Sequence, residues 1–204
     1  DPDARFREDA LRILRGARFS ARFCLTPDSA TLSAMERLAP LLDKIARERV
    51  FEELCKLFAS ATAQDLQQFI PLLTQVIPEL TPSVGFQQHS PHHRYDVFTH
   101  TAHVVEAVPK VLSLRWAALL HDIGKPASKQ WDDTHGWTFR NHNYLGQRMI
   151  PGIFKRLKLP LGEPMKFVQK MVDLHMRPIV LSEDVVTDSA VRRLLFEAGD
   201  DVDK

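Results

Sequence analysis

The stretch Trp116-Ala-Ala-Leu-Leu-His121-Asp122-Ile-Gly124-Lys125-Pro126 dictates the fold of the second half of the chain. Its apolar residues predict a helix that carries an adjacent imidazole and carboxylate to its end, where Gly124 and Pro126 stop it. Neighbouring side chains on a helix diverge by roughly 100°. One small ligand would therefore not contact both His121 and Asp122, whereas a metal ion over the helix end can. The simpler interpretation is a helix that ends in a solvated His-Asp pair, and the rest of the chain must decide between the two.

The composition is that of an ordinary globular protein. Of 204 residues, 44% are hydrophobic and 26% charged, and 27 basic side chains nearly balance 26 acidic ones, so the net charge of +1 predicts no partner by itself. The sequence has no long apolar segment and no signal-peptide pattern, which predicts a cytoplasmic protein without membrane contact. Cys24 and Cys55 lie in apolar helical contexts and are expected to be buried, reduced thiols. Because the chain starts at Asp1 without a methionine, we expect a fragment of a longer protein.

The first region, up to about residue 80, reads as a bundle of four helices, because apolar residues recur in it at helical spacing. The first run predicts one helix over residues 6–23. Within it, Asp9 and Arg12 are three residues apart and neighbours on the helix surface, so together they offer acceptors and donors to the edge of a nucleobase. The alternative is a surface salt bridge between Arg12 and Glu8 or Asp9, which only supports the helix.

The composition changes at residues 81–85, Thr-Pro-Ser-Val-Gly, and we place a domain boundary between residues 84 and 85. His89, His92 and His93 follow in what we interpret as a surface loop. A helix is expected to begin near Arg140, and Pro151-Gly152 interrupts it only if those residues are not themselves helical. Further helices are expected from about residues 96, 114, 164 and 187, with at most one short β-hairpin around residues 129–139.

A basic stretch runs through the second region. Between residues 140 and 177 the acidic residues of this stretch are Glu163 and Asp173. Its eight basic residues are Arg140, Arg148, Lys155, Arg156, Lys158, Lys166, Lys170 and Arg177. Such a stretch can face RNA phosphates or another anionic ligand. A solvated face on amphipathic helices is an equally open interpretation.

Four histidines and one aspartate fall near the ends or on the inner faces of separate helical segments of the second region: His100, His121, Asp122, His142 and His175. A single buried histidine is usually structural, but this regularity favours a divalent metal site. Mixed histidine and carboxylate ligands suit Mg²⁺, Mn²⁺ or Fe²⁺ better than a closed structural zinc site. A metal there lowers the pKa of bound water and holds a phosphate oxygen, as phosphoester hydrolysis requires, and Lys125 and Arg177 can neutralise the phosphate.

These motifs resemble a known superfamily. His100 within Thr-His-Thr-Ala-His-Val-Val, followed by His121-Asp122-Ile-Gly-Lys125, is similar to the HD-domain metal-dependent phosphohydrolases. The resemblance implies metal ligation by His100, His121 and Asp122, and makes His121, Asp122 and Lys125 the catalytic candidates. His142 and His175 match the extra histidines of two-metal members. The family carries a further, distal aspartate, for which Asp200 and Asp201 are the candidates within this chain.

The first region resembles a second family. Asp1-Pro2 and residues 5–19 and 45–57 are together similar to the neck and body of bacterial CCA-adding tRNA nucleotidyltransferases and related poly(A) polymerases, some of which carry an HD domain after the body. Glu8-Asp9-Ala-Leu-Arg12 matches that family's amino-acid template. The resemblance implies that Asp9 and Arg12 read the Watson–Crick edge of incoming CTP or ATP, and that Arg15 and Arg18 lie near the triphosphate. The polymerase head of that family, with its own Mg²⁺ site, is absent, so the chain by itself is expected not to polymerise nucleotides.

We therefore expect an all-α protein. Residues 1–84 are expected to form a helical neck and body of the nucleotide-template and RNA-binding type, and residues 85–204 an HD-type helical domain truncated at its C-terminus. The parent is expected to be an enzyme that adds CCA, or A, to tRNA 3′ ends, while its HD domain hydrolyses 2′,3′-cyclic or 2′-phosphates with Mg²⁺, Mn²⁺, Fe²⁺ or Ni²⁺. The alternatives are a stand-alone HD nucleotide phosphohydrolase and a non-catalytic RNA-binding module. The sequence leaves the oligomeric state open.

Overall fold

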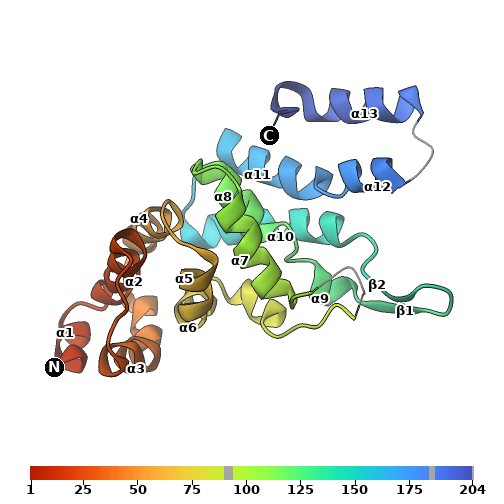
Figure 1. The fold of residues 1–204 in the computed structure, drawn as a ribbon. Helices are drawn as coiled ribbons and strands as arrows, with labels where there is room; N and C mark the ends of the chain where they lie inside the picture. Colours follow the sequence, from red (N-terminus) through yellow and green to blue (C-terminus); the bar gives the residue numbers. More distant parts are fainter. Residues whose placement is uncertain (90–93, 184–186, 204) are drawn as a thin grey trace.

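The computed structural model describes residues 1–89, 94–183 and 187–203 and shows an almost entirely helical chain (Figure 1). The α-helices are α1 (Pro2–Glu8), α2 (Leu11–Phe23), α3 (Ser29–Leu38), α4 (Arg47–Phe58), α5 (Ala63–Gln68), α6 (Ile70–Val76), α7 (Val97–Ala107), α8 (Leu112–Leu120), α9 (Lys125–Ser128), α10 (His142–Leu157), α11 (Glu163–Leu174), α12 (Arg177–Glu183) and α13 (Asp188–Ala198). Three 3₁₀ turns join them, η1 (Ala39–Lys44), η2 (Pro78–Ser83) and η3 (Gly199–Asp201). The expected all-α fold is confirmed. His92 and His93, expected in a surface loop, lie outside the described residues. Both cysteines are free thiols as expected, but the expected burial is wrong, because Cys24 is exposed as the C-cap of α2 and Cys55 is partly exposed.

The expected β-hairpin is also present. Strands β1 (Gln130–Asp132) and β2 (Gly136–Thr138) pair antiparallel, with Trp131 opposite Trp137. In Figure 1 the bundle α1–α6 occupies the end of the molecule that carries the N-terminus, and the hairpin projects at the opposite end. Helix α13 runs back past α12, which it contacts. In the part of the chain that the structure describes, no helix combines the length and the apolar character needed to cross a membrane.

The single helix predicted over residues 6–23 is wrong, because the structure breaks it between α1 and α2. Asp9 is extended, with φ −146° and ψ 103°, and forms the C-cap of α1. Its carboxylate accepts a hydrogen bond from the backbone N–H of Leu11 at 3.1 Å. Aspartate competes in this way for backbone donors and therefore favours caps over helix interiors. Asp9 and Arg12 consequently lie on either side of a turn and not on one helix face.

Helix α10, in contrast, continues through Pro151. Proline has no N–H to donate to the carbonyl four residues earlier, which here belongs to Gln147. That carbonyl accepts a hydrogen bond from Nε2 of Gln169 on α11 instead, at 3.3 Å. The neighbouring helix therefore satisfies the acceptor that proline leaves unpaired, and Pro151-Gly152 is helical.

The hydrophobic core is continuous between the two regions. Its cluster of buried residues runs from Phe6 to Val172. Trp116 of α8, 2% exposed, packs edge-on against Phe58 of α4, with ring centroids 5.1 Å apart, and against Phe154 of α10 at 6.2 Å. The apolar run that leads to His121-Asp122 is thus anchored in the first region. The boundary between residues 84 and 85 stays a prediction.

Two arginines tie the regions together by polar contacts. Arg115 of α8, 2% exposed, donates to the backbone carbonyl of Ala61 at 3.0 Å. Arg156 of α10 donates to the carbonyl of Val76 at 2.9 Å and pairs with Glu79. Val76 is the last residue of α6 and Ala61 lies in the connection between α4 and α5. The two arginines therefore satisfy backbone acceptors of the first region that no helix satisfies.

Gly124 allows α10 to approach the end of α8. A Cβ atom built on Gly124 would lie 2.1 Å from the carbonyl oxygen of His142 and 2.8 Å from the backbone nitrogen of Gly146. Both atoms belong to the backbone at the start of α10 and cannot yield without moving the helix. A residue without a side chain at position 124 is therefore needed to place His142 beside Asp122.

The substitution Gly124→Ala is expected to lower the free energy of unfolding by about 1–3 kcal/mol or more, because it forces backbone apart in a packed region. The measurement is urea-induced unfolding. Gly152→Ala is the matched control. Gly152 lies on α10, the helix that Gly124 contacts, and no atom lies within 4 Å of its Cβ position. Alanine there is expected to be neutral or stabilising, because glycine is a poor helix former. Equal stability of the two variants would contradict the close approach at Gly124.

Candidate metal centre

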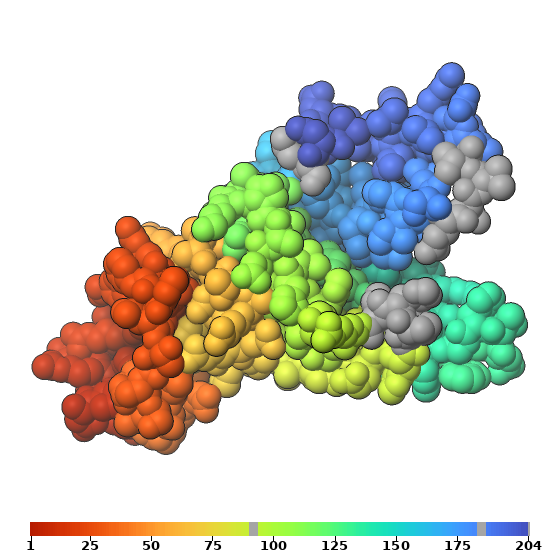
Figure 2. Space-filling view, viewed as in Figure 1, coloured from red at the N-terminus to blue at the C-terminus, as the bar shows by residue number. Residues whose placement is uncertain are grey.

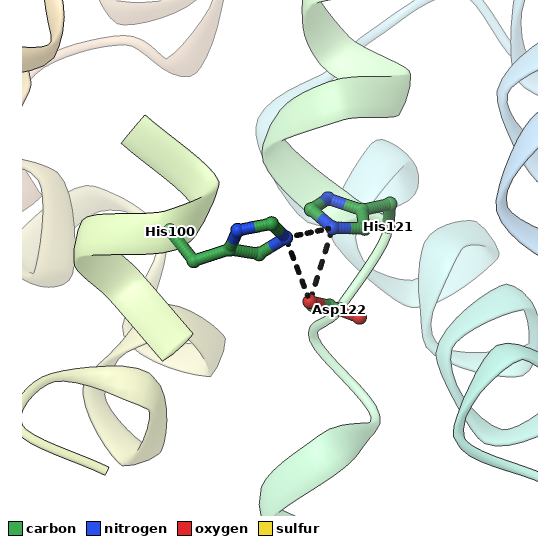
Figure 3. A group of neighbouring side chains, drawn as sticks. All are labelled: His100, His121 and Asp122. Carbon is green, nitrogen blue, oxygen red and sulfur yellow. Dashed lines mark hydrogen bonds and ion pairs between the residues drawn. The ribbon is translucent and has the colours of Figure 1, made fainter. Parts of the chain in front are cut away.

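The five predicted ligands meet at one place, although they come from four helical segments. His100 lies on α7, His121 is the C-cap of α8 and Asp122 follows it, His142 begins α10, and His175 is the C-cap of α11. Figure 3 shows His100 and His121 directed at Asp122 from two helices. Among the residues that the structure describes, the side chains that could hold a metal form two groups, with ligand atoms within 4.8 Å of one another: His100, His121 and Asp122, and Asp122, His142 and His175.

Asp122 is common to both groups. One oxygen, Oδ2, lies 3.0 Å from Nε2 of His121 and 3.6 Å from Nε2 of His100. The other, Oδ1, lies 3.3 Å from Nε2 of His142 and 3.7 Å from Nε2 of His175. Each carboxylate oxygen thus faces its own pair of histidines. This is the arrangement expected of a carboxylate that bridges two cations.

The backbone sets the protonation of three of the four imidazoles. In each, Nδ1 lies 2.7 Å from the carbonyl oxygen three residues earlier: His121 with Ala118, His142 with Phe139, and His175 with Val172. A carbonyl only accepts hydrogen bonds, so each Nδ1 carries the proton. In a neutral imidazole, Nε2 then has a free lone pair, and this nitrogen points towards Asp122. Contacts of this kind on the far nitrogen are typical of histidines that bind metals.

The Nε2 atoms of the histidines and the Asp122 carboxylate are better suited to bind a cation than to form hydrogen bonds with one another. The Nε2 atoms of His142 and His175 are only 3.1 Å apart, and with both protons on Nδ1 neither can donate to the other. The carboxylate of Asp122 is 1% exposed, and neither of its oxygens accepts a hydrogen bond of good geometry. Buried lone pairs and a buried negative charge require a positive partner. The residues present therefore fit one or two divalent metal ions.

The acid–base state of these groups also suits metal binding. Burial by itself raises the pKa of Asp122, but when their Nε2 atoms are protonated, His121, His142 and His175 outweigh it and hold the pKa well below the ordinary aspartate value. A bound metal ion would take the place of these Nε2 protons. Burial lowers the pKa of His175. A carboxylate and neutral imidazoles are the forms that ligate a metal.

Lys125, predicted as a catalytic residue, lies against the same carboxylate. Its Nζ is 2.8 Å from Oδ2 of Asp122, and it donates to Oε1 of Gln88 at 2.8 Å. Gln88 is 1% exposed and also donates from Nε2 to the carbonyl of Tyr95. Sequence reasoning missed Gln88, because its partner Lys125 lies 37 residues further along the chain. Gln88 holds Lys125 beside Asp122.

Three other predicted residues lie outside the two ligand groups of the described chain. Arg177, expected to neutralise phosphate, is 3.4 Å from Glu197. Asp201 pairs with Lys170 at 2.5 Å, and neither Asp200 nor Asp201 joins a ligand group. The position of the distal family aspartate therefore stays a prediction.

Of the predicted nucleotide-binding residues, two lie at the turn between α1 and α2. Arg12 donates to Glu8 at 2.6 Å, as in the simpler interpretation, and to the carbonyl of Arg5 at 3.2 Å. Asp9 lies 3.7 Å from Arg49 of α4. The two side chains stand close in the chain but contact different partners.

The other two nucleotide-binding candidates differ in exposure. Arg15 is exposed on α2. Arg18 is largely buried, with Nε 2.8 Å from Glu53 of α4 and its guanidinium 4.1 Å from the Phe19 ring. This ion pair holds α2 against α4. Nucleotide binding by these four residues, Asp9, Arg12, Arg15 and Arg18, stays a prediction.

The basic stretch is largely neutralised within the protein. Within the described ranges, five of its eight cations lie within ion-pair distance of a carboxylate: Arg140, Arg156, Lys166, Lys170 and Arg177. This pairing favours the solvated-face interpretation over a continuous RNA-binding surface.

Two family models match the chain. The model described as "Probable RNA and SrmB- binding site of polymerase A" matches residues 22–83. The model described as "HD domain" matches residues 92–198, which is more than half of the 204 residues.

Curated relatives match most of the chain. The A-adding tRNA nucleotidyltransferase of Deinococcus radiodurans is 36% identical over 188 residues, covering 83% of this chain and 42% of the relative. Multifunctional CCA proteins of Pseudomonas syringae pv. syringae and Nitrosococcus oceani are 29% and 31% identical, and each alignment covers 76% of this chain and 40% of the relative. The chain thus spans about two fifths of the length of these relatives. A segment of the polymerase A RNA-binding type precedes the HD match, and the chain is homologous to tRNA nucleotidyltransferases over most of its length. Because the HD model matches more than half of the chain, including the His-Asp cluster, the chain belongs to the HD domain family.

Proposed function

We propose that this chain is the body and HD domain of an enzyme that adds CCA, or A, to tRNA 3′ ends with CTP and ATP. Its HD domain would hydrolyse a phosphoester at an RNA end, a 2′,3′-cyclic phosphate or a 2′-phosphate. The observation that carries the hydrolytic part is the buried Asp122 carboxylate between two histidine pairs whose Nε2 atoms converge on it. A cytoplasmic location is part of the same proposal, because tRNA is processed there.

The residues of the centre have separate tasks. Asp122 and the four histidines hold the cations, and the backbone carbonyls keep the imidazole rings turned for ligation. A divalent ion supplies Lewis-acid activation of water and of the phosphate group. Lys125 keeps Asp122 in place and adds positive charge beside the phosphate position. Mg²⁺, Mn²⁺, Fe²⁺ and Ni²⁺ all accept this mixed ligand set.

The first region would serve the nucleotidyl transfer of the longer protein. The match of residues 22–83 to an RNA-binding model and the names of the relatives support tRNA as the partner. Asp9 and Arg12 would read the base of CTP or ATP, and Arg15 and Arg18 would lie near the triphosphate. Since Arg18 is held by Glu53, we expect Arg15 to make the freer contact. We expect that residues 1–204 by themselves do not polymerise nucleotides.

The chain is expected to bind two divalent ions. Asp122→Asn should lose both ions, because Asp122 faces both histidine pairs, whereas His175→Ala should lose one. The measurement is metal content by mass spectrometry after dialysis against Mn²⁺. His103→Ala is the matched control for His100→Ala, since His103 lies one turn further along α7, is exposed and belongs to neither ligand group. Equal loss in the two α7 variants, or no bound metal in the wild type, would contradict the site.

The chain is also expected to hydrolyse 2′,3′-cyclic AMP with Mn²⁺ or Ni²⁺. In Asp122→Asn the rate should fall by about two orders of magnitude or more, since activation of water and phosphate depends on the bound cation. Product release is followed by chromatography, with His103→Ala as the active control. If the wild type binds metal but turns over neither cyclic nor 2′-phosphates, the hydrolytic proposal fails and the RNA-binding alternative gains.

The nucleotide template is tested in the longer protein. Asp9→Ala combined with Arg12→Ala should abolish the choice between CTP and ATP, because the acceptors and donors that face the base edge are gone. Incorporation of each nucleotide into tRNA lacking its 3′ end is measured. Arg7→Ala is the control, as Arg7 is exposed on α1. Unchanged fidelity in the double variant would rule out the template.

A further inference from the structure

The β1–β2 hairpin exposes two tryptophans. Trp131 is 61% exposed and Trp137 is 40% exposed, whereas the third tryptophan of the chain, Trp116, is 2% exposed. The two hairpin rings lie opposite each other across the strands and meet edge to face, with centroids 5.3 Å apart and an angle of 78°. Figure 2 shows the hairpin as the teal projection at the edge of the molecule. Large exposed aromatic groups of this kind mark sites of interaction.

The rings are held in fixed positions. The indole N–H of Trp131 donates to Oδ1 of Asp133 at 3.1 Å. Because Trp137 meets Trp131 edge to face, the contact between the rings leaves much of the Trp131 surface open to solvent. An indole fixed in this way loses little conformational freedom when a ligand stacks on it.

A cation lies beside the rings. Nζ of Lys129 is 4.6 Å from the Trp137 ring centroid and 4.8 Å from that of Phe86, and it donates to the carbonyl of Gln87. Across the described residues, no carboxylate lies within ion-pair distance of Lys129. Its charge is therefore available to an anion that approaches the indoles.

The hairpin is continuous with the candidate metal centre. Phe139 directly follows β2, and its carbonyl accepts from Nδ1 of His142. The Phe139 ring packs against Phe86, with centroids 6.3 Å apart, and Nζ of Lys125 lies 6.0 Å from its centroid. The same aromatic residues thus support the Lys129–Trp137 contact on one side and the ligand cluster on the other. Phe139 thus joins the hairpin to the ligand cluster through direct contacts.

We propose that Trp131, supported by Trp137 and Lys129, forms a stacking site for a nucleobase of single-stranded RNA, a few nucleotides from the 3′ end whose phosphoester lies at the His-Asp centre. Every base has a π face, so an indole beside a cation binds single strands with little sequence preference. A protein partner fits less well, because a stable protein interface needs on the order of 1,000 Å² and the hairpin offers two rings. The inference rests on the proposed function for the position of the reacting phosphate.

The test measures binding without metal. A fluorescein-labelled single-stranded RNA that ends in CCA is titrated with the 204-residue chain in EDTA, and its anisotropy gives Kd. Trp131→Leu is expected to raise Kd by about tenfold, since one base–aromatic stack is lost. Phe196→Leu should leave Kd unchanged, as Phe196 is 88% exposed on α13, away from the hairpin. Unlabelled RNA should also quench the tryptophan fluorescence of the wild type, and an abasic strand of the same length should not.

Further variants separate stacking from hairpin stability. Trp131→Phe keeps an aromatic ring and should bind between the wild type and Trp131→Leu. Equal loss in the Phe and Leu variants, equal Kd in wild type and Trp131→Leu, or equal quenching by the abasic strand would overturn the stacking site. Because binding is measured without metal, failure of the hydrolytic proposal leaves this result unaffected. Hydrolysis of bis(p-nitrophenyl) phosphate, which lacks a base, should be unchanged in Trp131→Leu.

Discussion

The burial of the Asp122 carboxylate among four imidazoles sets the positions of four helical segments. A negative charge that is 1% exposed is tolerated only with positive partners around it, and Lys125 is one such partner. Two features of the nearby backbone bring the histidines to Asp122. Gly124 lets α10 come close enough to bring His142 to the carboxylate. Carbonyls three residues earlier turn His121, His142 and His175 towards it.

The centre is also tied to the first region of the chain. Trp116 belongs to α8, the helix that ends at His121, and it packs on Phe58 of α4. Movement of α4 relative to α8 would therefore disturb the core beneath the ligands. Arg115 and Arg156 satisfy carbonyls at helix ends in that region. A segment matched to an RNA-binding model and an HD domain therefore share one hydrophobic core. In the proposed enzyme, an RNA held by the first region would meet the HD centre at a constant distance.

The sequence pattern predicted secondary structure correctly where the periodicity of apolar residues within one short segment is sufficient to define it. Apolar spacing predicted the helices, and alternation around Asp132-Asp133 predicted the hairpin. Two other points depended on contacts that the pattern does not show. The prediction of one helix over residues 6–23 was wrong because the Asp9 side chain caps the backbone of Leu11. The pattern left open whether Pro151 interrupts its helix, and the helix continues because Gln169, on another helix, satisfies the carbonyl that proline leaves free.

The sequence by itself determined the all-α class, the hairpin and the identity of the five clustered side chains, because helical periodicity and residue chemistry are properties of short segments. Only the tertiary structure decided that Asp122 faces two histidine pairs, that Gln88 holds Lys125, and that Arg18 is committed to Glu53. These contacts join residues from different helices, and their geometry follows from the packing of backbones around Gly124 and Trp116. Spacing along one chain carries no information about such distances.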